Sequence, residues 1–107
     1  QARGKLVRRK AFAGGESRLP SDVQGRLKDL AEQMKTKEAL RMQLVAYAAG
    51  GDLSSSAARR LSLSRALAVR TFLIDNGVRS TRIDVRALGD KAPDEPANRV
   101  DVSLSER

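Results

Sequence analysis

The side chains in this sequence that could do chemistry are almost all charged, and two versatile catalytic groups are missing. The chain has 21 lysines and arginines and 13 acidic residues, but no histidine and no cysteine. Without imidazole or thiol groups, the usual nucleophile–base pairs and cysteine-ligated metal sites cannot be built. A carboxylate pair or a lysine nucleophile remains formally available. We therefore expect a protein that binds and is not an enzyme, with no metal and no cofactor.

The net charge of +8 has two explanations. The ordinary one is a solvated basic surface, and the more specific, sharper one is a polyanionic partner. The sharper one is attraction to nucleic acid, to an anionic membrane surface or to an anionic wall polymer. We expect no nucleic-acid partner, because the chain offers neither an aromatic stacking platform nor a recognised motif. We also expect no membrane insertion by this segment, because it has no run of about twenty apolar residues.

Two helices and four strands are expected to position the charges, in the order β-α-β-α-β-β. Alternating or helical spacing of apolar residues predicts strands over 5–12, 39–48, 83–87 and 99–104, a helix from Ser21, and a second from about Ser55 to Asn76. A helix bridges the second and third strands, so these should be parallel, with a right-handed crossover. The apolar face of the second helix is expected to comprise Leu63, Ala66, Leu67, Val69, Leu73 and Ile74.

One motif on the second helix carries a resemblance. The segment from Leu61 to Leu73 fits the pattern LS-x-x-RA-x-x-V-x-x-x-L, and Leu88-Gly89 and Asn98-Arg99-Val100 follow downstream. The chain resembles the OmpA-like C-terminal domain, the peptidoglycan-associated family, over roughly residues 12–104. The resemblance implies an α/β (α+β) fold with a four-stranded mixed sheet, order 1-4-2-3, and helices packed on one face. It also implies a basic segment with the start of the first strand over 1–11, and the OmpA-like domain over 12–107.

The resemblance further implies a site for the stem peptide of peptidoglycan. In the family, the arginine of the motif pairs with the carboxylate of the stem's diamino acid, and an aspartate after the second strand pairs with its ammonium group. Charge-assisted hydrogen bonds suit such a zwitterion. Arg65 matches the arginine. The alternative is that Arg65 is an exposed helix residue at the edge of the apolar face.

The family aspartate is missing from this chain. The family reads G-H-T-D-x-x-G after the strand, whereas this chain reads Ala-Tyr-Ala-Ala-Gly-Gly-Asp, so the aspartate falls on Ala49 or Gly50. Asp52 either substitutes for it on a pliable glycine loop or is an ordinary turn residue. Ala48 and Ala49 are expected to line the site. Arg99 is either a further ligand contact or an exposed strand residue.

Two functions follow from the resemblance. The first is a non-catalytic, peptidoglycan-associating domain that tethers a larger envelope protein to the cell wall, in the periplasm of a diderm bacterium. The alternative is a degenerate OmpA-like domain that has lost peptidoglycan binding and contacts an envelope protein as an interaction or scaffolding module. Because the chain begins with Gln1, we expect a fragment or a processed product.

Overall fold

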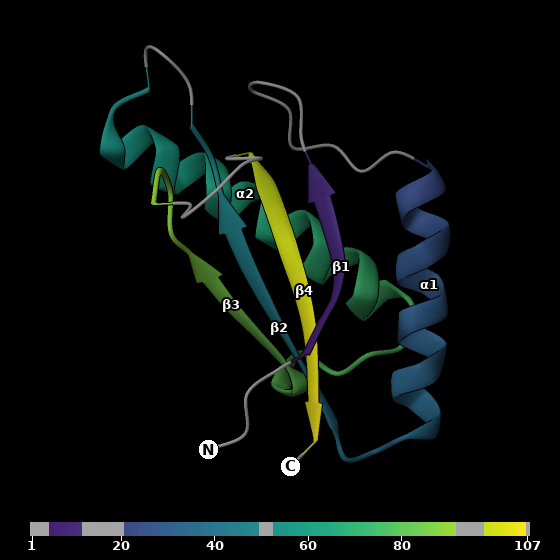
Figure 1. Cartoon of the computed structure of the whole chain (residues 1–107). Helices are drawn as coiled ribbons and strands as arrows, with labels where there is room; N and C mark the ends of the chain where they lie inside the picture. Colours follow the sequence, from purple (N-terminus) through teal and green to yellow (C-terminus); the bar gives the residue numbers. More distant parts are fainter. Residues whose placement is uncertain (1–4, 12–20, 50–52, 92–97, 107) are drawn as a thin grey trace.

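The computed structural model describes residues 5–11, 21–49, 53–91 and 98–106. The elements are the strands β1 (Lys5–Ala11), β2 (Leu40–Tyr47), β3 (Ile83–Ala87) and β4 (Arg99–Glu106), the helices α1 (Ser21–Thr36) and α2 (Ser55–Asp75), and a 3₁₀ turn, η1 (Ser80–Arg82). The strands form one sheet in the order β1-β4-β2-β3, and both helices pack on the same face of it (Figure 1). The predicted α+β class, with a mixed sheet and helices, is confirmed.

Strand β2 lies in the interior of the sheet. It runs parallel to β3, with Leu44 opposite Val85, and antiparallel to β4, with Leu44 opposite Val102. The predicted parallel pair joined through a helix is therefore confirmed. Strand β1 pairs antiparallel with β4, so Lys5–Ala11 forms an edge of the sheet. The domain boundary between residues 11 and 12 stays a prediction.

The core lies between the sheet and the two helices. On α1, Leu27, Leu30, Ala31 and Met34 are all buried, and Val23 packs against this cluster partly buried. From the sheet, alternate residues point into the same layer, which gives the period-two burial expected of a strand with one covered face. These buried strand residues are Leu40, Met42, Leu44, Ala46, Ile83, Val100, Val102 and Leu104.

The predicted apolar face of α2 is wrong at two positions. Leu63 is 41% exposed and Leu67 is 40% exposed, although both were expected in the core. The buried positions are instead Ala58, Ser62, Arg65, Ala66, Val69 and Leu73. The helix is rotated because small side chains let its backbone approach the sheet closely, and because the Arg65 guanidinium finds hydrogen-bond partners inside.

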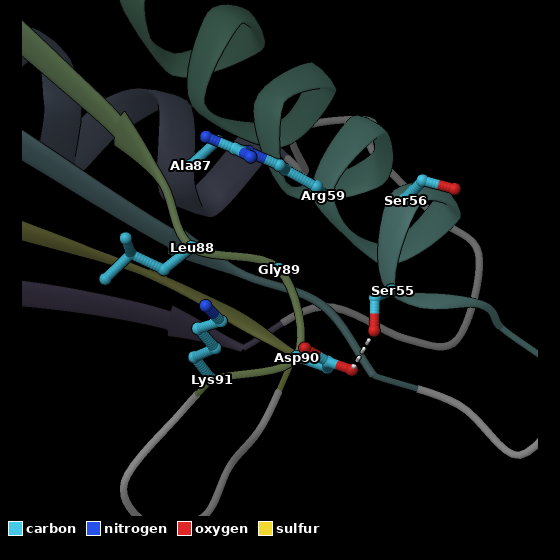
Figure 2. Close-up of a pocket in the computed structure, with 8 residues that line it drawn as sticks. All are labelled: Ser55, Ser56, Arg59, Ala87, Leu88, Gly89, Asp90 and Lys91. Carbon is cyan, nitrogen blue, oxygen red and sulfur yellow. Dashed lines mark hydrogen bonds between the residues drawn. The ribbon is translucent and has the colours of Figure 1, made fainter.

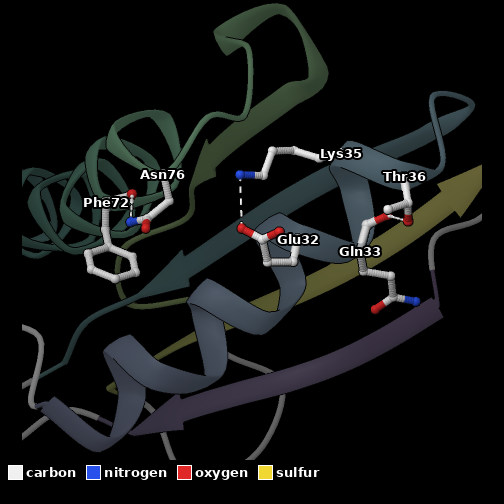
Figure 3. A network of polar contacts seen from close by, with 6 residues as sticks. All are labelled: Glu32, Gln33, Lys35, Thr36, Phe72 and Asn76. Atoms are coloured by element: carbon white, nitrogen blue, oxygen red, sulfur yellow. Dashed lines mark hydrogen bonds and ion pairs between the residues drawn. The ribbon is translucent and has the colours of Figure 1, made fainter.

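Hydrogen bonds close both ends of α2. At its start, Ser54 Oγ accepts from the amide of Ala57 at 3.1 Å, as expected of a serine N-cap. At its end, the side-chain amide of Asn76 donates to the Phe72 carbonyl at 2.8 Å (Figure 3). Gly77 follows with φ +101°, a conformation that suits glycine. The predicted end of the helix at about Asn76 is confirmed.

Arg82 closes the end of α1, a role that the strand pattern does not predict. Its guanidinium donates to the carbonyls of Met34 at 2.9 Å, Lys37 at 2.8 Å and Leu40 at 2.8 Å. Lys37 directly follows the helix, and Leu40 begins β2. The Met34 carbonyl lies in the last turn of α1, where helix carbonyls lack partners within the helix. On the outer surface of the same turn, Lys35 pairs with Glu32 at 2.8 Å (Figure 3). No helix in the described part of the chain is long and apolar enough to span a membrane.

Candidate functional site

Arg65 is the centre of a buried polar network at the carboxyl end of β2. Its side chain is 0% exposed. The Nη1 atom donates to the carbonyl of Tyr47 at 3.2 Å and to Oδ1 of Asn98 at 2.7 Å. A buried guanidinium needs such acceptors, because an unsatisfied charged donor is costly in a protein interior. The alternative that Arg65 is an exposed helix residue is therefore wrong.

Asn98 holds Ala49, the second residue after the end of β2. Its Oδ1 accepts from the amide of Ala49 at 3.0 Å, and its Nδ2 donates to the Ala49 carbonyl at 2.8 Å. The side-chain amide thus satisfies both backbone groups of Ala49, as a neighbouring strand would do. Arg65 fixes the amide orientation, because a guanidinium can donate only to the oxygen.

Ala48 is held from the other side by the end of β3. Its amide donates to the Gly89 carbonyl at 2.8 Å, and the amide of Leu88 donates to the Ala46 carbonyl at 2.9 Å. Ala48 is fully buried. The segment 48–49 is therefore fixed between Gly89 and Asn98.

Arg99 lies on the opposite face of the sheet from the core. Val100 is buried against the helices, so its neighbour Arg99 points the other way. The Arg99 guanidinium lies 4.7 Å from the ring centroid of Tyr47, its partner in the β2–β4 register, and Nε lies 3.2 Å from the Asp101 carboxylate. Arg99 is only 2% exposed. The alternative that Arg99 is an exposed strand residue is therefore wrong.

Four of the five predicted site residues thus meet at one end of the sheet: Ala48, Ala49, Arg65 and Arg99. The fifth, Asp52, lies outside the described residues. Arg65 and Arg99 contact Tyr47 from the two faces of the sheet, one at its carbonyl and the other at its ring. The Arg99 charge is paired with the Asp101 carboxylate, and Arg65 brings a buried positive charge to the end of β2 that suits an anionic group such as a carboxylate. Within the described ranges, no cluster of three or more potential metal-ligating side chains occurs. The direct role of each residue in binding stays a prediction.

A hollow of about 380 Å³ lies beside this end of the sheet, between the first turn of α2 and the segment after β3. Among the residues that line it, Ser55 Oγ donates to Oδ2 of Asp90 at 3.3 Å, and Arg59 and Lys91 also line it (Figure 2). Gly89 forms its buried wall with φ +59°. The Gly89 amide donates to Ser62 Oγ at 3.1 Å, which ties the segment after β3 to α2.

Sequence reasoning missed Tyr47 and Asn98 as parts of this network. Asn98 stands directly before the last strand, and an asparagine at a strand boundary often bonds to nearby backbone. That signal is local, however, and the partner, Ala49, lies 49 residues away. Tyr47 contributes through its backbone carbonyl to Arg65, a contact that no side-chain pattern encodes.

The comparisons with known proteins agree with this architecture. The family described as the OmpA family matches residues 11–103. No curated protein matches significantly. Among solved structures, the OmpA-like domain of FopA1 from Francisella tularensis subsp. tularensis SCHU S4 is 19% identical, with a TM-score of 0.79 over 92% of this chain and 73% of that chain.

Two further structures share the fold. The peptidoglycan-associated lipoprotein from Burkholderia pseudomallei is 20% identical, with a TM-score of 0.79 over 92% of this chain and 91% of that one. The C-terminal domain of Helicobacter pylori MotB is 16% identical, with a TM-score of 0.75 over 94% and 86% of the two chains. At these identities the structural likenesses establish the fold alone, while the family match covers most of the sequence. The chain therefore belongs to the OmpA family.

Proposed function

We propose that the chain is a non-catalytic domain that associates with peptidoglycan and anchors a larger envelope protein to the cell wall from the periplasmic side. The observation that carries the proposal is the network of Arg65, Asn98 and Ala49, which fixes the carboxyl end of β2 beside a buried positive charge. Membership of the OmpA family and structural likeness to a peptidoglycan-associated lipoprotein support the same general kind of function.

In this proposal, Arg65 acts as a positioning residue. Its guanidinium is fully buried, so it stands behind the end of β2 and contributes its charge through space, while holding Asn98 and the Tyr47 carbonyl. A carboxylate of the stem peptide would be attracted to this end of the sheet. The charge acts more strongly there than in water, because the surroundings have a low dielectric constant.

The test is a titration of the ¹⁵N-labelled chain with a stem peptide that contains diaminopimelate, followed by amide chemical shifts. We expect saturable shifts at Ala48, Ala49 and the side-chain amide of Asn98. The side-chain amide of Asn76, at the far end of α2, should stay unchanged and serves as the internal control. A peptide with lysine in place of diaminopimelate lacks the second carboxylate and should bind more weakly.

Cosedimentation with purified sacculi, at low and at moderate salt, is the second arm. Binding that persists at moderate salt supports a specific site, because attraction between exposed charges is screened over about 8–10 Å under those conditions. If a folded sample shows no shifts at millimolar peptide and does not pellet with sacculi, peptidoglycan association is refuted. The degenerate interaction module would then be the better explanation, and the missing aspartate at position 49 or 50 already points in that direction.

A further inference from the structure

Helix α2 presents two large apolar side chains to solvent. Leu63 and Leu67 lie one turn apart and are 41% and 40% exposed. With Leu53, they are the large hydrophobic residues that the described part of the chain leaves exposed. Grouped apolar side chains on a protein surface commonly mark an interaction site, whereas single ones do not.

The charges around these leucines all have one sign. Arg59 and Arg60 are exposed in the turn before Leu63, and Arg70 is half-buried in the turn after Leu67. From Ser55 to Ile74 the helix contains no acidic residue. We call the set Arg59, Arg60, Leu63, Leu67 and Arg70 the outer face of α2.

Helix α1 provides the contrast within the same molecule. Its exposed surface mixes Lys28 and Lys35 with Asp29 and Glu32, and it exposes no large apolar side chain among the residues described. Such mixed charges are typical of a solvated helix. The outer face of α2 differs in both respects, so solvation alone does not account for it.

The position of α2 makes its outer face accessible to a flat partner. The helix lies in the layer that covers one face of the sheet, so its outer surface is also an outer surface of the domain (Figure 1). A specific protein interface needs about 800 Å² from each partner, far more than two exposed leucine side chains supply. Association with an anionic lipid surface needs less, because each arginine near the headgroups and each inserted apolar group adds to it separately.

We propose that the outer face of α2 binds the surface of an anionic lipid bilayer. The arginines meet the phosphates of the headgroups, and Leu63 and Leu67 enter the boundary between headgroups and acyl chains. The surface differs from the Arg65 network, because Arg65 is 0% exposed on the core side of the same helix. Arg59 also lines the hollow beside that network, whereas Leu63 and Leu67 do not. Either proposal can therefore fail without the other.

The test is cosedimentation of the full chain with vesicles of phosphatidylcholine that contain about one-third phosphatidylglycerol, at low salt. We expect binding to these vesicles and none to pure phosphatidylcholine. Arg59→Gln with Arg60→Gln should weaken partitioning about 30-fold, on the basis of about 1 kcal/mol for each cation near an anionic surface. Leu63→Ser with Leu67→Ser, which leaves the charge unchanged, should weaken it by about fivefold or more.

The matched control is Lys28→Gln with Arg86→Gln. This pair removes the same two charges from exposed positions outside α2, so it should retain most of the binding. If the Arg59/Arg60 variant and the Lys28/Arg86 variant lost vesicle binding equally, net charge alone would explain the attraction and the proposal would be overturned. The same would hold if the Leu63/Leu67 variant kept full vesicle binding. Absence of binding to the anionic vesicles would also overturn the proposal. If the chain then bound polyglutamate, the partner of this face would be an acidic polypeptide.

Discussion

The guanidinium of Arg65 donates to Oδ1 of Asn98 at 2.7 Å, which joins α2 to the residue that directly precedes β4. Through this contact, a residue of the helix motif sets the orientation of an amide at the start of the last strand. That amide in turn holds both backbone groups of Ala49. Three segments that are distant in sequence are thereby fixed at the place where the site is proposed.

Replacing Asn98 tests this arrangement most directly. Asn98→Ala removes the partner of both backbone groups of Ala49 and one acceptor of Arg65, and should lower the free energy of unfolding by about 1–2 kcal/mol. Asn98→Asp keeps the acceptors but loses the donor to the Ala49 carbonyl. Its free energy of unfolding should therefore lie between those of the wild type and Asn98→Ala. Urea unfolding can be followed by fluorescence of Tyr47, since the chain has one tyrosine and no tryptophan. If Asn98→Ala unfolded with the stability of the wild type, the hydrogen bonds of the Asn98 side chain would not contribute to the stability of the fold.

Arg65→Met should destabilise the domain more strongly, by about 2–4 kcal/mol, because buried acceptors on Tyr47 and Asn98 lose a charged donor. The matched control is Arg60→Met on the exposed side of the same helix, for which we expect a change within about 0.5 kcal/mol. Thermal and urea unfolding of both variants give the comparison. Similar losses in the two variants would contradict the assigned role of Arg65.

Gly89 and Gly25 should respond to alanine in opposite directions. At Gly89, φ is +59° and an added Cβ would lie 3.1 Å from the backbone nitrogen of Arg59. Gly89→Ala should therefore lose about 1–3 kcal/mol, from the left-handed conformation and the close contact together.

At Gly25, inside α1, an added Cβ meets nothing within 4 Å. Gly25→Ala should therefore gain about 0.5–1 kcal/mol, because alanine is the better helix former. The midpoints of urea unfolding, measured for Gly89→Ala and Gly25→Ala, test the two predictions. A neutral Gly89→Ala would mean that the segment after β3 moves freely away from α2.

Arg82→Ala should destabilise the end of α1. The variant leaves the carbonyls of Met34, Lys37 and Leu40 without their guanidinium donor. The expected loss is about 1–3 kcal/mol, with faster amide exchange in the last turn of α1. Arg79→Ala is the control, because Arg79 is exposed and its side chain makes no capping hydrogen bond. Unchanged exchange in Arg82→Ala would refute the capping role.

The element order and the parallel pairing of β2 with β3 could be predicted from the sequence. These follow from local periodicity and from the geometry of a helix that bridges two strands. The family could also be inferred, since the motif from Leu61 to Leu73 and its downstream companions lie in a fixed order along the chain.

Which face of α2 is buried, and what Arg65 contacts, could not be predicted from the sequence and follow from the folded structure. Hydrophobic periodicity assigns leucine to the core and arginine to solvent, yet Leu63 is exposed and Arg65 is buried. The reason is that close packing of a helix on a sheet favours small side chains at the contact, and that acceptors from Tyr47 and Asn98 satisfy the guanidinium there. Those acceptors lie 18 and 33 residues from Arg65, so only the folded chain brings them together.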